Sequence, residues 1–146
     1  MRTIFEHLMS QKIFLPIFMS TMIIFSALQT APIVLGQNQT GNEDRVIGYA
    51  QKARELLNQT LNEYKNGNVT GAEDLATNAY LDNFENVESP LIKKKSTDLK
   101  QEIEKMMRED LRTLIKDKVP VEELSSHVNA TDSKLIEAIQ ILNDTQ

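Results

Sequence analysis

The stretch Leu99-Lys-Gln-Glu-Ile-Glu-Lys-Met-Met-Arg-Glu-Asp-Leu-Arg-Thr-Leu-Ile115 decides the fold class. Its apolar residues recur at steps of three and four, which is the spacing of one face of an α-helix. The stretch therefore predicts an amphipathic helix that packs one side against a core. The residues expected on that side are Leu99, Ile103, Met106, Met107, Leu111, Leu114 and Ile115.

The same spacing predicts two further helices on the N-terminal side of this stretch. Thr40 and Glu43 have the spacing of a capping box, and the apolar pattern that follows them ends near Asn66-Gly67. A second capping box, Thr70-Gly-Ala-Glu73, begins the next helix. We expect Ser89-Pro90 to end or kink that helix, because proline disfavours helical geometry in the residue before it.

The C-terminal part of the chain predicts a fourth helical segment in two pieces. Pro120 suits the first position of a helix, and Thr131-Asp132 has the residue types that cap a new one. Short links place consecutive helices side by side in opposite directions. The sequence therefore predicts an all-α fold, an up-and-down bundle of four helices with the fourth interrupted.

The first 36 residues have the features of a secretory signal peptide. The first 12 residues carry the basic side chains Arg2 and Lys12 and are followed by an apolar run over residues 13–28. Val34 and Gly36 are small enough for the positions that signal peptidase recognises at a cleavage site. We expect a signal peptide at 1–36, a polar tether at 37–42 and a helical-bundle domain at 43–146, located outside the cytoplasm as a secreted or cell-surface protein. The alternative is a retained membrane anchor, because the apolar run resumes at residues 33–35.

Composition excludes several classes of function. The chain has no cysteine, which excludes disulfides, thiolate metal sites and thiol catalysis. Its formal net charge of −5 argues against nucleic acid or anionic lipid as the main partner. No phosphate-binding glycine loop, nucleophile elbow or histidine-based triad is present, so we do not expect an enzyme.

Asparagine sequons are dense in the part of the chain after residue 36. Sequons mark solvated sites in exported proteins, and their number without any cysteine favours an archaeal cell-surface glycoprotein. We expect glycans at the tether and link positions Asn38, Asn68 and Asn143 rather than at Asn58, within the first helix. The five sequons begin at Asn38, Asn58, Asn68, Asn129 and Asn143.

Helical geometry sorts the acidic residues and leaves two interpretations open. Glu104 and Asp110 fall within or beside the apolar arc of the third helix, and Glu88 lies at the arc edge of the second, next to Leu81 and Phe84. Buried charges must be paired or bind a cation. They could therefore form an internal ion pair with Arg54, or gather around a hard cation such as iron or calcium. That cation set would be Glu85, Glu88 and Glu104 with Asp110 or Asp82.

One histidine remains beyond the signal segment. His127 stands four residues after Glu123, so the two could share a helix face. A single imidazole without a ligand cluster is a weak metal site. We therefore expect His127 to have a capping or surface role.

Part of the chain resembles the extracytoplasmic helical domain attached to bacterial high-affinity iron permeases. The resemblance lies in Ala79-Tyr-Leu-Asp-Asn-Phe-Glu-Asn-Val-Glu-Ser-Pro-Leu91, then Glu102-Ile-Glu104 and Leu111-Arg112, within residues 46–118. The Arg-Glu-x-x-Glu motif of the permease is absent, since Arg54-Glu-Leu-Leu-Asn58 lacks the second glutamate. The resemblance thus implies the accessory domain without the permease.

The resemblance implies iron as the ligand and a membrane iron transporter as the partner. It also implies that Tyr80 and Arg112 shape the surroundings of the site. We accordingly expect an exported accessory protein that binds iron or another hard cation for uptake or delivery. The alternative is a structural or interaction domain of a glycosylated surface protein with no metal role. The metal-binding residues implied are Glu85, Glu88, Glu102 and Glu104.

Overall fold

The computed structural model describes residues 37–144, and all of its regular structure is helical. The expected signal peptide, its cleavage site and the alternative anchor lie outside the described residues. Within them, no helix is both long and apolar enough to cross a membrane. The elements are α1 (Gln37–Lys65), α2 (Val69–Asn78), η1 (Ala79–Phe84), α3 (Glu85–Lys93), α4 (Thr97–Lys105), η2 (Met106–Asp110), α5 (Leu111–Lys116) and α6 (Val121–Asn143), where η marks a π-helical segment.

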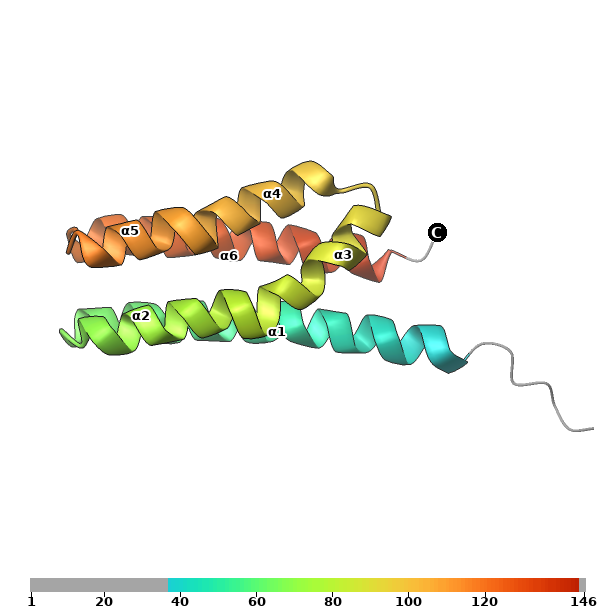
Figure 1. The fold of residues 1–146 in the computed structure, drawn as a ribbon, viewed down its shortest axis with the longest axis horizontal. Coiled ribbons are helices and arrows are strands. Elements are labelled where there is room, and N and C mark those ends of the chain that lie inside the picture. Colours follow the sequence, from blue (N-terminus) through green and yellow to red (C-terminus); the bar gives the residue numbers. More distant parts are fainter. Residues whose placement is uncertain (1–36, 145–146) are drawn as a thin grey trace, which may run out of the picture. The chain divides into compact units, whose positions relative to one another are not determined.

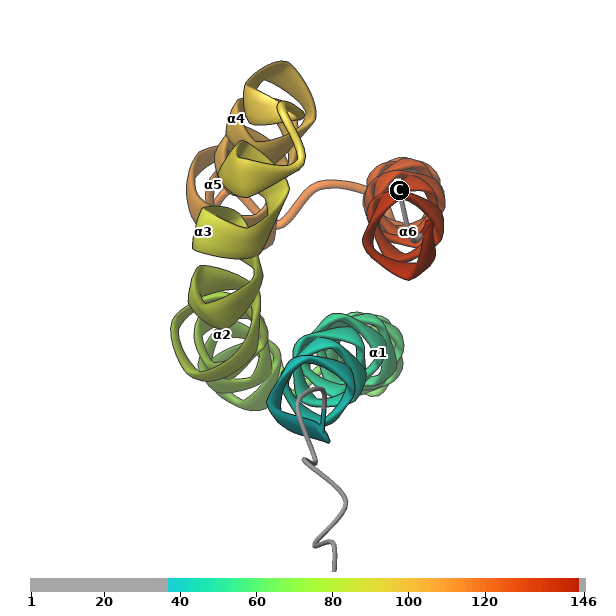
Figure 2. The same cartoon turned by 90° about the vertical axis from the view of Figure 1, so that its right-hand side faces the viewer.

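These elements form four helical columns, which confirms the expected all-α class. The columns are α1, the continuous run α2–η1–α3, the continuous run α4–η2–α5, and α6. Consecutive columns run in opposite directions (Figure 1). Viewed end-on, α1 lies between α2 and α6, and the α4–α5 column lies above α2 and beside α6 (Figure 2).

The core between the columns contains the residues that the apolar spacing predicts. In the third column Leu99, Ile103, Met107, Leu111 and Ile115 are buried, which confirms the predicted register. Every column contributes large side chains to the same cluster, among them Leu57, Phe84 and Leu135, all fully buried. Burial of this continuous apolar surface is the main force that holds the columns together.

The first helix begins earlier than the sequence predicts. Residues 37–42, expected as a polar tether, form the first turns of α1. These residues show no apolar spacing, so their sequence does not indicate whether the first helix continues into them or whether they form a tether. The predicted end is confirmed, because α1 stops at Lys65 and Gly67 follows with a positive φ of 78°.

The residue that caps α2 also differs from the prediction. Asn68, not Thr70, is the N-cap, and its Oδ1 accepts a hydrogen bond of 3.1 Å from the backbone N–H of Gly71. Both residue types cap helices well. The turn at Asn66 and Gly67 leads directly into Asn68, so α2 begins two residues earlier than predicted and Asn68 takes the capping position.

The second column does not end at Ser89-Pro90, because α3 continues through Pro90 to Lys93. Pro90 cannot donate the hydrogen bond to the carbonyl four residues before it. The column changes direction between α2 and α3 (Figure 1), where the π-helical segment η1 departs from regular α-helical hydrogen bonding. Leu81, expected at the apolar edge, lies within η1 and is 48% exposed.

The fourth column is one uninterrupted helix, so the predicted break at Thr131-Asp132 is wrong. The Thr131 hydroxyl donates to the His127 carbonyl, four residues before it and within α6. Asp132 reaches across to α1, where its two carboxylate oxygens accept from Arg54 at 2.6 and 3.0 Å. Both residues would also suit a helix start, and the sequence alone could not show that α6 uses them internally.

The Arg54–Asp132 pair should contribute measurably to stability. It is bidentate and the side chains are only 33% and 22% exposed, so its charges are screened less than those of a surface pair. A double-mutant cycle with Arg54→Gln and Asp132→Asn, measured by urea unfolding, is expected to give a coupling free energy of about 1 kcal/mol. The exposed pair Lys52–Glu55 is the control, and an equal coupling at both pairs would contradict the expectation.

Candidate functional site: the Lys100 cluster

The most elaborate polar group in the described residues joins the second and third columns. We call it the Lys100 cluster, and it consists of Tyr80, Glu88, Lys100, Glu104 and Arg108. The Lys100 ammonium lies 2.6 Å from Oε2 of Glu104 and 3.5 Å from Oε2 of Glu88. Arg108 Nη1 lies 3.1 Å from the other Glu104 oxygen, and the Tyr80 hydroxyl donates to Glu88 Oε1 at 3.2 Å. Two carboxylates therefore face two cations and one hydroxyl.

Partial burial strengthens the contacts of the cluster. The side chains of Lys100, Glu88 and Glu104 are 16%, 21% and 24% exposed. The hydrogen bond from Lys100 is the largest cause that lowers the pKa of Glu104, and the same bond raises the pKa of Lys100. Both groups are therefore held in their charged forms.

Tyr80 is the most buried member of the cluster. Burial, and then the nearby carboxylates of Glu88, Glu104 and Glu85, raise the pKa of its phenol to about 12. The phenol therefore stays protonated at neutral pH and acts as a hydrogen-bond donor to Glu88. Glu85 takes part only through its charge, because its side chain is exposed.

The four residues predicted as metal ligands do not form one group. Glu88 and Glu104 meet at Lys100, and Glu85 lies near enough to affect Tyr80. Glu102 instead pairs with Lys134 of α6 at 2.9 Å. It points elsewhere because residues two apart on a helix do not share a face. Nowhere between residues 37 and 144 do three or more acidic or histidine side chains lie close enough together to hold a metal ion.

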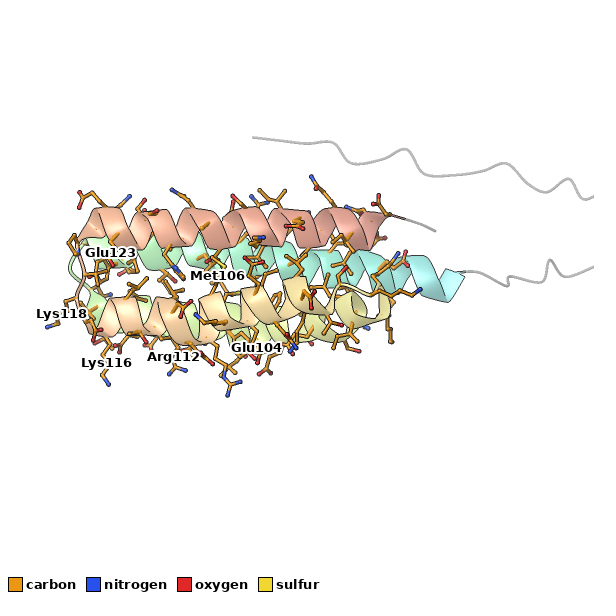
Figure 3. All side chains as sticks on the ribbon, turned by 90° about the horizontal axis from the view of Figure 1, so that it is seen from above. Glu104, Met106, Arg112, Lys116, Lys118 and Glu123 are labelled. Atoms are coloured by element: carbon orange, nitrogen blue, oxygen red, sulfur yellow. The ribbon has the colours of Figure 1, made fainter. Side chains whose placement is uncertain are left out.

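The other charged residues considered from the sequence lie outside the cluster. Arg54, expected to pair internally, does so with Asp132 and not with these glutamates. Asp110 is partly buried as predicted, but its carboxylate pairs with Lys105 at 2.7 Å. Asp82 is exposed. Arg112 lies further along the third column than Glu104, on the side turned away from α6 (Figure 3).

His127 has a structural contact that the sequence did not reveal. Its Nε2 lies 2.8 Å from the backbone carbonyl of Met106, so this nitrogen carries a proton and donates it. Met106 begins η2, and its carbonyl also accepts the π-type hydrogen bond from Leu111. His127 thus ties α6 to the π-helical turn of the third column.

Lys100 and Arg108 were not predicted as partners of Glu104, although each lies four residues from it in the sequence. Lys100, Glu104 and Arg108 follow one another at steps of four and so share one helix face. The same rule that placed Glu104 at the edge of the core therefore also places its two partners there. Only the approach of Glu88 and Tyr80 from another column needed the structure.

Comparison with known proteins adds no relative. No protein-family model, no curated protein and no solved structure matches the chain.

Proposed function

We propose that the chain is an exported protein whose helical bundle serves as a structural or interaction domain at the cell surface. The observation that carries this proposal is the position of the Lys100 ammonium between the carboxylates of Glu88 and Glu104. A metal site would leave these carboxylates free to bind a cation. Here a side chain of the same protein neutralises them and joins two helical columns.

The charge balance of the cluster supports this proposal. Glu88 and Glu104 contribute two negative charges, and Lys100 and Arg108 contribute two positive ones. A hard cation entering between the glutamates would have to displace an ammonium that is held at 2.6 Å. Such a balanced network specifies how two helices pack together, and needs no ligand.

A metal-related accessory role is the second candidate, and one observation favours it. The negative charges of Glu85, Glu88 and Glu104 all raise the pKa of Tyr80, so three carboxylates lie within electrostatic reach of its hydroxyl. These are three of the residues that the resemblance to the iron-permease domain implies as ligands. Under this candidate Lys100 would swing away when iron binds, and the bundle would deliver iron to a membrane transporter.

Calorimetric melting of the protein with and without Fe²⁺, under anaerobic conditions, separates the two candidates. For a structural cluster, Fe²⁺ leaves the melting temperature of the wild type unchanged, and Glu88→Gln and Glu104→Gln both melt at lower temperature. For a metal site, Fe²⁺ at 100 times its dissociation constant stabilises the wild type by about 2.7 kcal/mol. Removing one carboxylate would then weaken binding without destabilising the protein, because like charges repel when the ion is absent.

Glu102→Gln is the matched control for that experiment. Glu102 lies on the same helix as Glu104 but pairs with Lys134, and its side chain is 49% exposed. Its substitution is expected to leave both the melting temperature and any response to Fe²⁺ as in the wild type. A response to Fe²⁺ that is lost in Glu88→Gln and Glu104→Gln but kept in Glu102→Gln would establish the second candidate.

Export itself makes a separate prediction about the mature chain. Cleavage after Gly36 yields a protein that begins at Gln37, with the loss of ammonia if that glutamine cyclises. The intact mass of protein purified from its native host measures this directly. A mass that includes residues 1–36, recovered from the membrane fraction, would show a retained anchor instead.

A further inference from the structure

Three of the five sequons lie wholly within the part of the chain whose side chains are described. They begin at Asn58 in α1, at Asn68 before α2 and at Asn129 in α6. All three asparagines are exposed, so exposure of the asparagine does not distinguish them. The difference lies in the threonine two residues later, which every sequon requires.

The threonines at Asn58 and Asn129 are inaccessible in the folded protein. Thr60 and Thr131 are both fully buried. Their hydroxyls donate hydrogen bonds of 2.9 Å to the carbonyls of Leu56 and His127, in the preceding turns of their helices. A modifying enzyme can reach these hydroxyls only after the helix unwinds, which would also bring core residues into water.

The sequon at Asn68 is accessible to solvent in the folded protein. Asn68 and Thr70 are both exposed, and the turn before them contains Gly67 with a φ of 78°. Unlike the other two threonines, Thr70 lies in the first turn of its helix, where there is no earlier helical carbonyl for its hydroxyl to bind. Both groups that a glycosylating enzyme must reach are therefore at the surface together.

Attachment of a glycan at Asn68 is compatible with the bonds that this residue makes. Its Oδ1 caps α2 through Gly71, and its Nδ2 donates to Glu63 Oε2 at 2.6 Å. In N-glycosylation the amide nitrogen forms a bond to C1 of a lipid-linked oligosaccharide. The bond between C1 and the lipid phosphate breaks, the phosphate leaves, and the amide gives up one of its two protons. The carbonyl oxygen and one N–H remain, so the cap survives.

We propose that, of the three sequons within the described part of the chain, Asn68 is the one that the folded protein presents for glycosylation, and that folding closes Asn58 and Asn129 to modification. This inference rests on the proposed export, which brings the chain to the glycosylating enzyme. The site stands at the α1–α2 turn, at the opposite end of the bundle from the N-terminus of α1 (Figure 1). A glycan there would project beyond the helix ends and leave the faces of the bundle uncovered.

The test is glycosylation of the full chain in detergent by a purified oligosaccharyltransferase that accepts any Asn-x-Thr, with a lipid-linked oligosaccharide as donor. Peptide mapping gives the rate at each asparagine, and short peptides that contain each sequon give the unfolded reference. Asn68 should react in the folded chain about as fast as in its peptide. Asn58 and Asn129 should react at least about 100-fold more slowly than in theirs, because only the rare unfolded fraction exposes their threonines.

Two variants sharpen the test. Thr70→Ala should abolish modification at Asn68 while leaving the melting temperature unchanged, since Asn68 still caps α2. Leu111→Ala, which lowers global stability, should raise the rates at Asn58 and Asn129 by about tenfold for every 1.4 kcal/mol lost and leave the rate at Asn68 unaltered. Equal rates at the three asparagines in the folded chain would overturn the proposal.

Failure of the proposed export gives a different result. In that case the purified folded chain is still modified at Asn68 by the added enzyme, while protein from the native host carries no glycan and retains residues 1–36. A folded chain that resists modification at Asn68 in the purified reaction refutes the site itself, whatever the location of the protein.

Discussion

Replacing Leu111 by alanine is expected to lower the free energy of unfolding by about 2 to 5 kcal/mol, because it leaves a cavity in a packed core. Leu111 is fully buried, and it is the first residue of α5 after the π-helical turn η2. The neighbouring helices cannot close around the gap without moving other buried side chains. Urea unfolding followed by far-ultraviolet circular dichroism measures the change.

Leu81→Ala is the control for the Leu111 substitution. It removes the same atoms from a side chain that is 48% exposed on η1. Its expected effect is below about 0.5 kcal/mol, as for most surface substitutions. If the two variants lose equal stability, the placement of Leu111 in the core and of Leu81 at the surface is wrong.

The apolar pattern predicted the four columns and most of the core. It failed where local structure departs from a regular α-helix. Leu81, expected beside Phe84 at the edge of the apolar arc, lies in the π-helical segment η1 and is 48% exposed. A π-helical turn has no reliable sequence signature, so a calculation that assumes ideal helices cannot detect it.

Capping signals predicted the helix ends less well than apolar spacing predicted the helices. Thr131-Asp132 has the chemistry of a helix start, yet both residues are used inside α6. Pro90 has the chemistry of a helix end, yet α3 passes through it. In both places packing against the other columns outweighs the local preference, which is worth only about 1 to 3 kcal/mol.

For the candidate site, the sequence identified carboxylates but not their partners. Helical spacing correctly placed Glu88 and Glu104 at the edge of the core. It could not show that both face Lys100, because Glu88 and Lys100 belong to different columns. It paired Arg54 with the wrong residues for the same reason, since Asp132 lies 78 positions away in the chain. Contacts between columns depend on how the helices pack, which spacing within one helix does not determine.

Replacing Lys100 by methionine is expected to lower the free energy of unfolding by about 1 to 3 kcal/mol at pH 7, because it leaves partly buried carboxylates without their shared cation. Methionine keeps the volume of the lysine stem, so the loss reports the charge and not a cavity. Glu104 retains Arg108 at 3.1 Å, whereas Glu88 keeps only the Tyr80 hydroxyl. Lys134→Met, which removes a more exposed lysine from Glu102, is the matched control and should change stability little.

The pH dependence of the Lys100→Met loss tests its electrostatic origin. Lys100 is the largest cause of the lowered pKa of Glu104. A lowered pKa means that the charged carboxylate stabilises the fold at every pH above its unfolded value of about 4.3, and that this contribution disappears as the pH falls through the folded value. The difference between wild type and Lys100→Met should therefore be full at pH 7 and shrink below pH 4. Urea unfolding at both values measures it, and a loss of the same size at pH 3 would mean that Lys100 acts through packing instead.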